Sequence, residues 1–115
     1  KSKKWKNQFT FLPTPNTIKP SWFSLVILIN EKFLKKKKKF IKFLTSKGIE
    51  TRPIISGNFL KQPAAKLFRL NKRRDKFPNA DKIDQKGFFI GLTTSHLSKN
   101  KINYLVNNLL KISEI

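Results

Sequence analysis

A nine-residue stretch of mostly apolar side chains near the start of the chain constrains its fold more than any other feature. Residues 22–30, WFSLVILIN, are rich in aromatic and β-branched side chains, which favours a strand buried on both faces or nearly so. Residues 31–47 follow directly, and their apolar side chains recur at three- and four-residue spacings. This spacing predicts an amphipathic helix, and Gly48 is placed to end it in the left-handed conformation. A buried strand joined to such a helix predicts a sheet covered by helices.

The rest of the chain continues this alternation of strands and helices. In order, the pattern predicts a strand at 49–55, short helices at 62–70 and 79–86 with a basic loop at 71–78 between them, a strand at 87–92, and a last helix capped by Ser98. Pro53 cannot donate a ladder hydrogen bond, so the strand at 49–55 must be an edge strand or irregular at that point. We therefore predict an α+β fold, a small, mostly antiparallel three-stranded sheet with helices packed on one face.

The domain organisation follows from length and from the prolines. A chain of 115 residues suits one domain. Residues 1–20 are basic and then proline-rich, which disfavours a helix, so we expect an extended lead-in at 1–20 and the domain proper at 21–115. The sequence contains no Met, even at position 1, which indicates a processed product or a fragment.

Composition excludes several kinds of site. The absence of Cys excludes disulfides and thiolate-bound zinc or iron–sulfur clusters, and it fits a cytoplasmic protein. The one histidine, His96, cannot form a multi-histidine metal site. The longest apolar run, residues 25–29, is far too short to span a bilayer, so we expect no membrane span.

The net charge of +20 has two interpretations. An anionic partner such as nucleic acid or an anionic surface would explain it. A lysine-rich surface without a partner is the alternative, and 22 Lys against only 4 Arg favours it, because Arg supplies the bidentate contacts to phosphate and bases. The five lysines at 35–39 are interpreted in the same way, as a solvated helix face.

The segment at 51–58, TRPIISGN, concentrates the polar chemistry of the chain. Arg52 comes near a strand end and can pair with a phosphate or a sugar hydroxyl. Gly57 would let the backbone approach a ligand closely. An ordinary strand-to-loop turn explains the same residues equally well.

Three motifs give the chain a resemblance to a known family. They are GIETRPIISGNFLKQPA at 48–64, PSWF at 20–23, and ADKI at 80–83 followed by GFFIGL at 87–92. In this order they resemble the DegT/DnrJ family of sugar-nucleotide aminotransferases, over about residues 11–115. The nearest branch is the 3-dehydrase-like group that makes the dideoxy sugars of lipopolysaccharide, typified by CDP-4-dehydro-6-deoxyglucose 3-dehydrase.

The resemblance implies a fold-type-I enzyme that uses pyridoxal or pyridoxamine phosphate (PLP or PMP). In that family a large N-terminal domain binds the cofactor and provides the catalytic Lys, or His in the dehydrase branch, and the complete enzyme is a homodimer. The chain matches only the C-terminal small domain. It is therefore expected to have no catalytic residue and to be inactive alone.

The residues expected to contact substrate by this resemblance are Arg52, Ser56, Gly57, Asn58 and Gln62. The substrate implied is a nucleotide-linked 4-keto-6-deoxy sugar of lipopolysaccharide or O-antigen synthesis. One departure is Thr93, which stands where family members often have His. Two alternatives stay open: a small basic module that binds nucleic acid or an anionic surface, and a domain that docks onto a separately encoded cofactor-binding partner.

Overall fold

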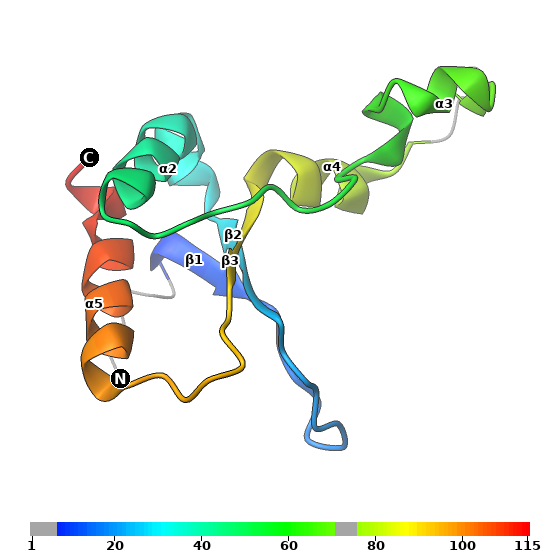
Figure 1. Ribbon diagram of the computed structural model, residues 1–115. Helices are drawn as coiled ribbons and strands as arrows, with labels where there is room; N and C mark the ends of the chain where they lie inside the picture. Colours follow the sequence, from blue (N-terminus) through cyan, green and yellow to red (C-terminus); the bar gives the residue numbers. More distant parts are fainter. Residues whose placement is uncertain (1–6, 71–75) are drawn as a thin grey trace.

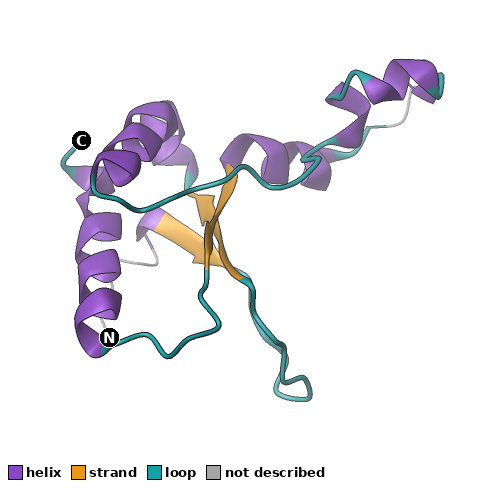
Figure 2. Cartoon of the chain, viewed as in Figure 1, coloured by secondary structure: helices purple, strands orange, loops and turns teal. Residues whose placement is uncertain are grey.

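The computed structural model describes residues 7–70 and 76–115. Its centre is a three-stranded antiparallel sheet in the order β1-β2-β3, shown in Figures 1 and 2. The strands are β1 (Phe9–Phe11), β2 (Ser24–Ile29) and β3 (Gly87–Gly91). The apolar run at 22–30 thus supplies the central strand, as its pattern predicted, and the α+β fold with a three-stranded antiparallel sheet is confirmed.

Two helices cover one face of this sheet. Helix α2 (Lys37–Ser46) follows a 3-10 turn, η1 (Glu31–Lys36), and helix α5 (Lys99–Leu110) continues into η4 (Lys111–Ser113). Figure 1 shows α2 and α5 on the same side of the strands. The buried core lies between these helices and the sheet. It is formed by Phe9, Ile27, Ile29, Phe40, Leu44, Ile49, Phe88, Ile90, Leu109 and Ile112. Among the described residues, no helix combines the length and apolarity needed to cross a membrane.

The predicted ends of the two covering helices are largely correct. Gly48 has a φ of +70° and ends α2 in the left-handed conformation. Ser98 is the N-cap of α5, where its side chain accepts a hydrogen bond from the backbone N–H of Lys101 at 3.3 Å. Residues 31–36 form a 3-10 turn instead of the first α-helical turns, which is a common arrangement at helix starts.

The identity of one edge strand differs from the prediction. Residues 49–55 form no strand, and their only pairing is an isolated bridge between Arg52 and Phe89, because Pro53 interrupts the ladder one residue later. The third strand is β1, which pairs Phe9 with Ile29 on the other edge of β2. Phe9 is only 2% exposed. The lead-in expected at 1–20 therefore contains a strand of the sheet.

After its bridge to β3 at Arg52, the connection from α2 to β3 extends away from the sheet, as Figure 1 shows. It contains η2 (Phe59–Lys61), α3 (Ala64–Leu67) and α4 (Pro78–Lys86). The helix predicted at 62–70 is shorter than expected, and residues 71–75 of the predicted basic loop lie outside the described residues. Helix α4 ends at Lys86 and β3 begins at Gly87 without an intervening loop.

Candidate substrate site at the free edge of the sheet

A groove runs along the edge of β3 that does not pair with β2. We call it the edge groove, and its volume is about 1280 Å³. Its lining comes mainly from residues 48–50 and 52–56, from Gln62, from the end of β3 with the following Leu92, and from the first half of α5. Apolar side chains form most of the lining, with a few polar groups among them, which is the usual composition of a small-molecule site.

Arg52 lies at the centre of one wall of the edge groove. Its backbone exchanges two hydrogen bonds with Phe89 of β3, at 2.9 and 2.8 Å, so its position is fixed to the strand. Its guanidinium donates to Glu50 Oε1 from Nε at 2.9 Å and from Nη2 at 2.7 Å. The side chains of both residues are exposed, at 67% and 73%. Because exposed ion pairs contribute about 0–1 kcal/mol, an anionic ligand can compete with Glu50 for this guanidinium.

A tight turn with two left-handed residues follows Arg52. Ser56 has a φ of +66° and Gly57 a φ of +49°, and the Gly57 N–H donates to the carbonyl of Ile54 at 3.1 Å. Gln62 Nε2 donates to the Ser56 carbonyl at 3.1 Å, so the amide closes the turn. A Cβ on Gly57 would lie 2.1 Å from Asp84 Oδ1. A larger residue is therefore disfavoured here by the left-handed backbone, and it would fit only if the Asp84 side chain moved aside.

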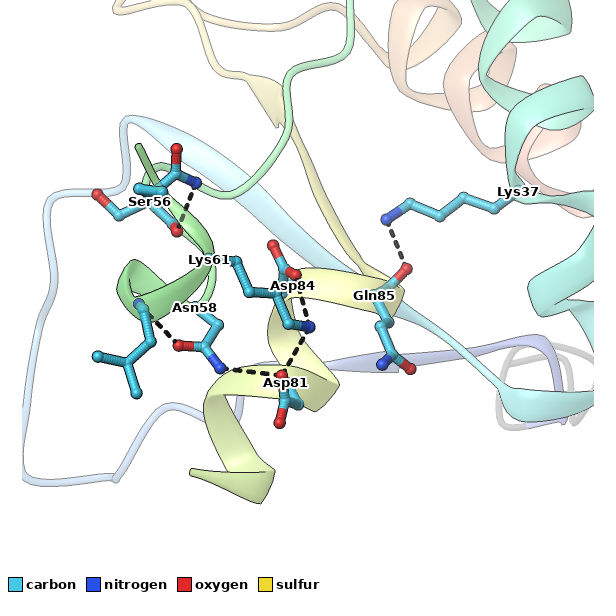
Figure 3. A network of polar contacts seen from close by, with 9 residues as sticks. Lys37, Ser56, Asn58, Lys61, Asp81, Asp84 and Gln85 are labelled. Carbon is cyan, nitrogen blue, oxygen red and sulfur yellow. Dashed lines mark hydrogen bonds and ion pairs between the residues drawn. The ribbon is translucent and has the colours of Figure 1, made fainter. Parts of the chain in front are cut away.

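Asn58 fastens the turn to α4, as Figure 3 shows. Its side chain is buried, with 6% of the residue exposed. Nδ2 donates to Asp81 Oδ1 at 2.9 Å, and Oδ1 accepts from the Leu60 N–H at 3.1 Å. The second bond makes Asn58 the N-cap of η2. Both hydrogen-bonding ends of this amide are used within the protein.

Lys61 completes the same cluster, which sequence patterns did not predict. Its Nζ lies 2.6 Å from Asp81 Oδ1 and 3.2 Å from Asp84 Oδ2. The hydrogen bonds to Asp81 and Asp84 raise the pKa of Lys61. Two hydrogen bonds lower the pKa of the Asp81 carboxyl, and the one from Lys61 has a larger effect than the one from Asn58. The two carboxylates are spaced i, i+3 on one helix face, which was the only signal in the sequence that could have suggested a shared partner.

The structure divides the five predicted substrate residues into two groups. Arg52, Ser56 and Gln62 line the edge groove. Gly57 and Asn58 do not line it and instead shape the turn and hold it to α4. In the part of the chain that the structure describes, no group of three or more His, Cys, Asp or Glu residues is placed to hold a metal ion.

The lysine run at 35–39 is less solvated than its charge predicted. Lys36 donates to the carbonyl of Ser113 at 3.2 Å and Lys39 to that of Ile115 at 3.0 Å. Lys37 donates to the carbonyls of Gln85 and Gly87 at 2.7 and 2.9 Å. Burial lowers the pKa of Lys37, with Asp84 opposing the effect. Three of the five ammonium groups therefore bind backbone carbonyls of other elements.

The comparison with protein families decides what kind of domain this is. The model of the DegT/DnrJ/EryC1/StrS aminotransferase family matches residues 4–110. The chain belongs to this family. It is 33% identical over 88 residues to a GDP-4-keto-6-deoxy-D-mannose 3-dehydratase of Yersinia pseudotuberculosis, covering 74% of the chain and 22% of the relative. It is 36% identical over 84 residues to the lipopolysaccharide biosynthesis protein RfbH of Salmonella typhimurium, and this match covers 68% of the chain and 18% of RfbH.

Solved structures show the same relationship. A GDP-4-keto-6-deoxymannose-3-dehydratase superposes on 92% of the chain with a TM-score of 0.71 and 28% identity, over 27% of its own length. The Escherichia coli enzyme of this name superposes on 95% with a TM-score of 0.66 and 26% identity, again over 27% of its length. The chain thus spans about a fifth to a quarter of these family members.

Both solved relatives contain PLP, so the edge groove can be tested for a fit to this cofactor. PLP sites combine a lysine for the aldehyde with an acidic partner for the ring nitrogen and a phosphate site. Of the acidic residues that line the groove, Glu50 pairs with Arg52 and Asp84 with Lys61. Lys101 of α5 also lines the groove, so a lysine is present, but neither acidic residue of this lining is unpaired and available for the ring nitrogen. The groove therefore does not supply the complete set of groups that holds this cofactor. This agrees with a cofactor held by another domain.

Proposed function

We propose that this chain is the small domain of a PLP-dependent nucleotide-sugar 3-dehydratase or aminotransferase of lipopolysaccharide synthesis, acting in the cytoplasm on a nucleotide-linked 4-keto-6-deoxy sugar. A large domain holds the cofactor, and this chain closes the substrate pocket with the edge groove. One observation supports this proposal above the others. The segment that resembles the dehydrase branch places an exposed guanidinium, a hydroxyl and an amide along one groove of a fold shared with two such dehydratases.

The proposed roles follow from the chemistry of the three groove residues. Arg52 exchanges Glu50 for a phosphate oxygen or sugar oxygen of the substrate, because a guanidinium binds such acceptors in bidentate geometry. Ser56 and Gln62 lie on the same wall and donate to sugar hydroxyls. The chain contributes binding and orientation, and the reacting groups belong to the large domain. The complete enzyme works as a homodimer, with the large domain on the same chain or on a separate one.

A chimera tests this proposal directly. In the Yersinia dehydratase, the segment that aligns with this chain is replaced by it, and consumption of GDP-4-keto-6-deoxy-D-mannose is measured with added PLP. We expect turnover, and we expect Arg52→Ala to lower kcat/KM by about 10–100-fold, since a hydrogen bond to a charged group contributes about 1.5–3 kcal/mol. Lys66→Ala, an exposed substitution on α3, is the matched control and should change kcat/KM less than twofold.

Two results would contradict the proposal. A chimera that folds and binds PLP but consumes no substrate would show that this small domain does not build the pocket. Equal kcat/KM for the Arg52→Ala and Lys66→Ala chimeras would show that Arg52 does not bind the substrate.

A further inference from the structure

A second groove lies on the outer surface of α2, next to the end of α4. We call it the lysine groove, and its volume is about 710 Å³. Leu34 and Ile41 form its apolar part, and Lys35, Lys38 and Lys42 stand around them. Lys37 and Gln85 close the end toward α4, where Figure 3 shows the ammonium of Lys37 directed at the Gln85 carbonyl. None of the residues that line this groove lines the edge groove.

The three lysines of the rim differ from the rest of the lysine run. Lys35, Lys38 and Lys42 are exposed, and their spacing of three and four residues places them along one side of the helical segment. Lys36, Lys37 and Lys39 are held by backbone carbonyls. The rim therefore presents ammonium groups that the helix packing does not use.

The acidic residues of the protein do not neutralise this rim. Five of the six lie in the described part of the chain, and each forms an ion pair elsewhere: Glu31 with Lys86, Glu50 with Arg52, Asp81 and Asp84 with Lys61, and Glu114 with Lys111. Within residues 7–70 and 76–115, no ion pair joins any rim lysine to an acidic group. Three like charges thus surround an apolar strip, and none of the described acidic residues pairs with them.

We propose that the lysine groove binds an acidic amphipathic helix of a partner protein, with one bulky apolar side chain against Leu34 and Ile41 and carboxylates against the rim lysines. Charge complementarity supplies the long-range attraction, and helix-in-groove packing supplies the apolar contact. The other anionic partners fit less well. Binding to a bilayer depends on a broad apolar face, whereas the apolar part of this site is two half-buried side chains, Leu34 and Ile41. The lining offers neither aromatic rings for base stacking nor Arg for base recognition.

The test uses the 115-residue chain and three fluorescent probes in fluorescence anisotropy at 50 and 200 mM salt. The first probe is a 15-residue helical peptide of Glu, Ala and Leu, with Glu at i, i+3 and i+7 flanking Leu residues. The second is poly-Glu of the same length, and the third is a 15-nucleotide oligo-dT. We expect the amphipathic peptide to bind at least fivefold more tightly than either other probe, and more weakly at 200 mM salt.

Matched variants assign the binding to the groove. Lys35→Gln/Lys38→Gln/Lys42→Gln should weaken peptide binding at least tenfold. Lys66→Gln/Lys82→Gln/Lys99→Gln removes the same charge from exposed positions outside the groove and should weaken it less than twofold. Leu34→Ala should weaken the amphipathic peptide but not poly-Glu, with circular dichroism confirming that each variant is folded.

Four results would overturn the proposal. Equal losses in the two triple variants would mean that only net charge matters. Equal affinity for poly-Glu and for the amphipathic peptide would show that Leu34 and Ile41 do not contribute to binding. Tighter binding of oligo-dT than of the peptide would show that the rim lysines favour nucleic acid. Absence of peptide binding at 50 mM salt would show that the lysine groove does not bind an acidic amphipathic helix.

Discussion

Gly57→Ala is the substitution that most directly examines how the candidate site is built. Gly57 has a φ of +49°, and a Cβ there would lie 2.1 Å from Asp84 Oδ1 and 2.9 Å from Asp84 Cγ. The added methyl group must therefore adopt a left-handed backbone and also push the Asp84 side chain aside. Moving Asp84 breaks its contact with Lys61 at 3.2 Å, which helps to hold the turn to α4.

Gly48→Ala provides the control, because it isolates the backbone part of this effect. Gly48 has a φ of +70°, and nothing lies within 4 Å of the position of its Cβ. A left-handed non-glycine residue costs about 1–2 kcal/mol, and the stiffer unfolded chain offsets about 0.4–1 kcal/mol of this. These contributions are common to both variants. Displacing Asp84 from its rotamer adds about 0.5–1.5 kcal/mol for Gly57→Ala alone.

Urea denaturation followed by circular dichroism measures the free energy of unfolding of both variants. We expect Gly48→Ala to lower it by about 1 kcal/mol and Gly57→Ala by about 2 kcal/mol. Adding Asp84→Ala to each variant should remove the difference between them, because the displaced side chain is then absent. Equal destabilisation by the two single variants would refute the claim that Asp84 closes the space beside Gly57.

Three further predictions concern the anchoring of the turn and the edge of the sheet. Asn58→Ala should lower the free energy of unfolding by about 1–2 kcal/mol through loss of a buried cap, whereas the exposed Asn107→Ala should change it by less than about 0.5 kcal/mol, both measured by urea denaturation. Because the pKa of Asp81 is held below its ordinary value of 3.8, its contribution to stability is present above that pH and lost as the pH falls through the lowered value. The urea concentration at the denaturation midpoint should therefore decrease as the pH is lowered below about 4, and Asp81→Asn should reduce this decrease. An equal decrease in the variant would contradict the assigned pairing of Asp81. Phe9→Ala should destabilise by about 3–5 kcal/mol and the 60% exposed Leu12→Ala by less than about 0.5 kcal/mol, and similar midpoints in a thermal melt would exclude β1 from the core.

Most elements could be predicted from the sequence, including the short α4 and β3, whereas the strand β1 and the irregular course of residues 49–55 could not. The run at 22–30 and the stripe of α5 are each long enough to show their periodicity. The strand β1 has three residues, Phe9–Phe11, and stands beside prolines that indicate a loop. The segment at 49–55 has strand-like composition, but Pro53 leaves it only one bridge to β3. Pairing partners depend on chain geometry that no local pattern contains.

The candidate site shows the same division. Arg52, Ser56 and Gln62 could be proposed from family motifs, and they share a groove. The roles of Gly57 and Asn58 as supports, and the presence of Lys61 between two carboxylates, depend on how the turn lies against α4. Nothing in the spacing of 23 residues between Asn58 and Asp81 indicates that contact.

The direct joining of α4 to β3 has a mechanical consequence. The turn at 56–58 is fastened to α4 by Asn58, and Arg52 is fastened to Phe89 of β3. Because α4 and β3 follow each other without a loop, both sets of hydrogen bonds connect the groove wall to one continuous stretch of regular structure. The groove wall from Arg52 to Asn58 is therefore expected to move together with the sheet. A displacement of this wall relative to the sheet would have to break the hydrogen bonds of Asn58 with Asp81 and of Arg52 with Phe89.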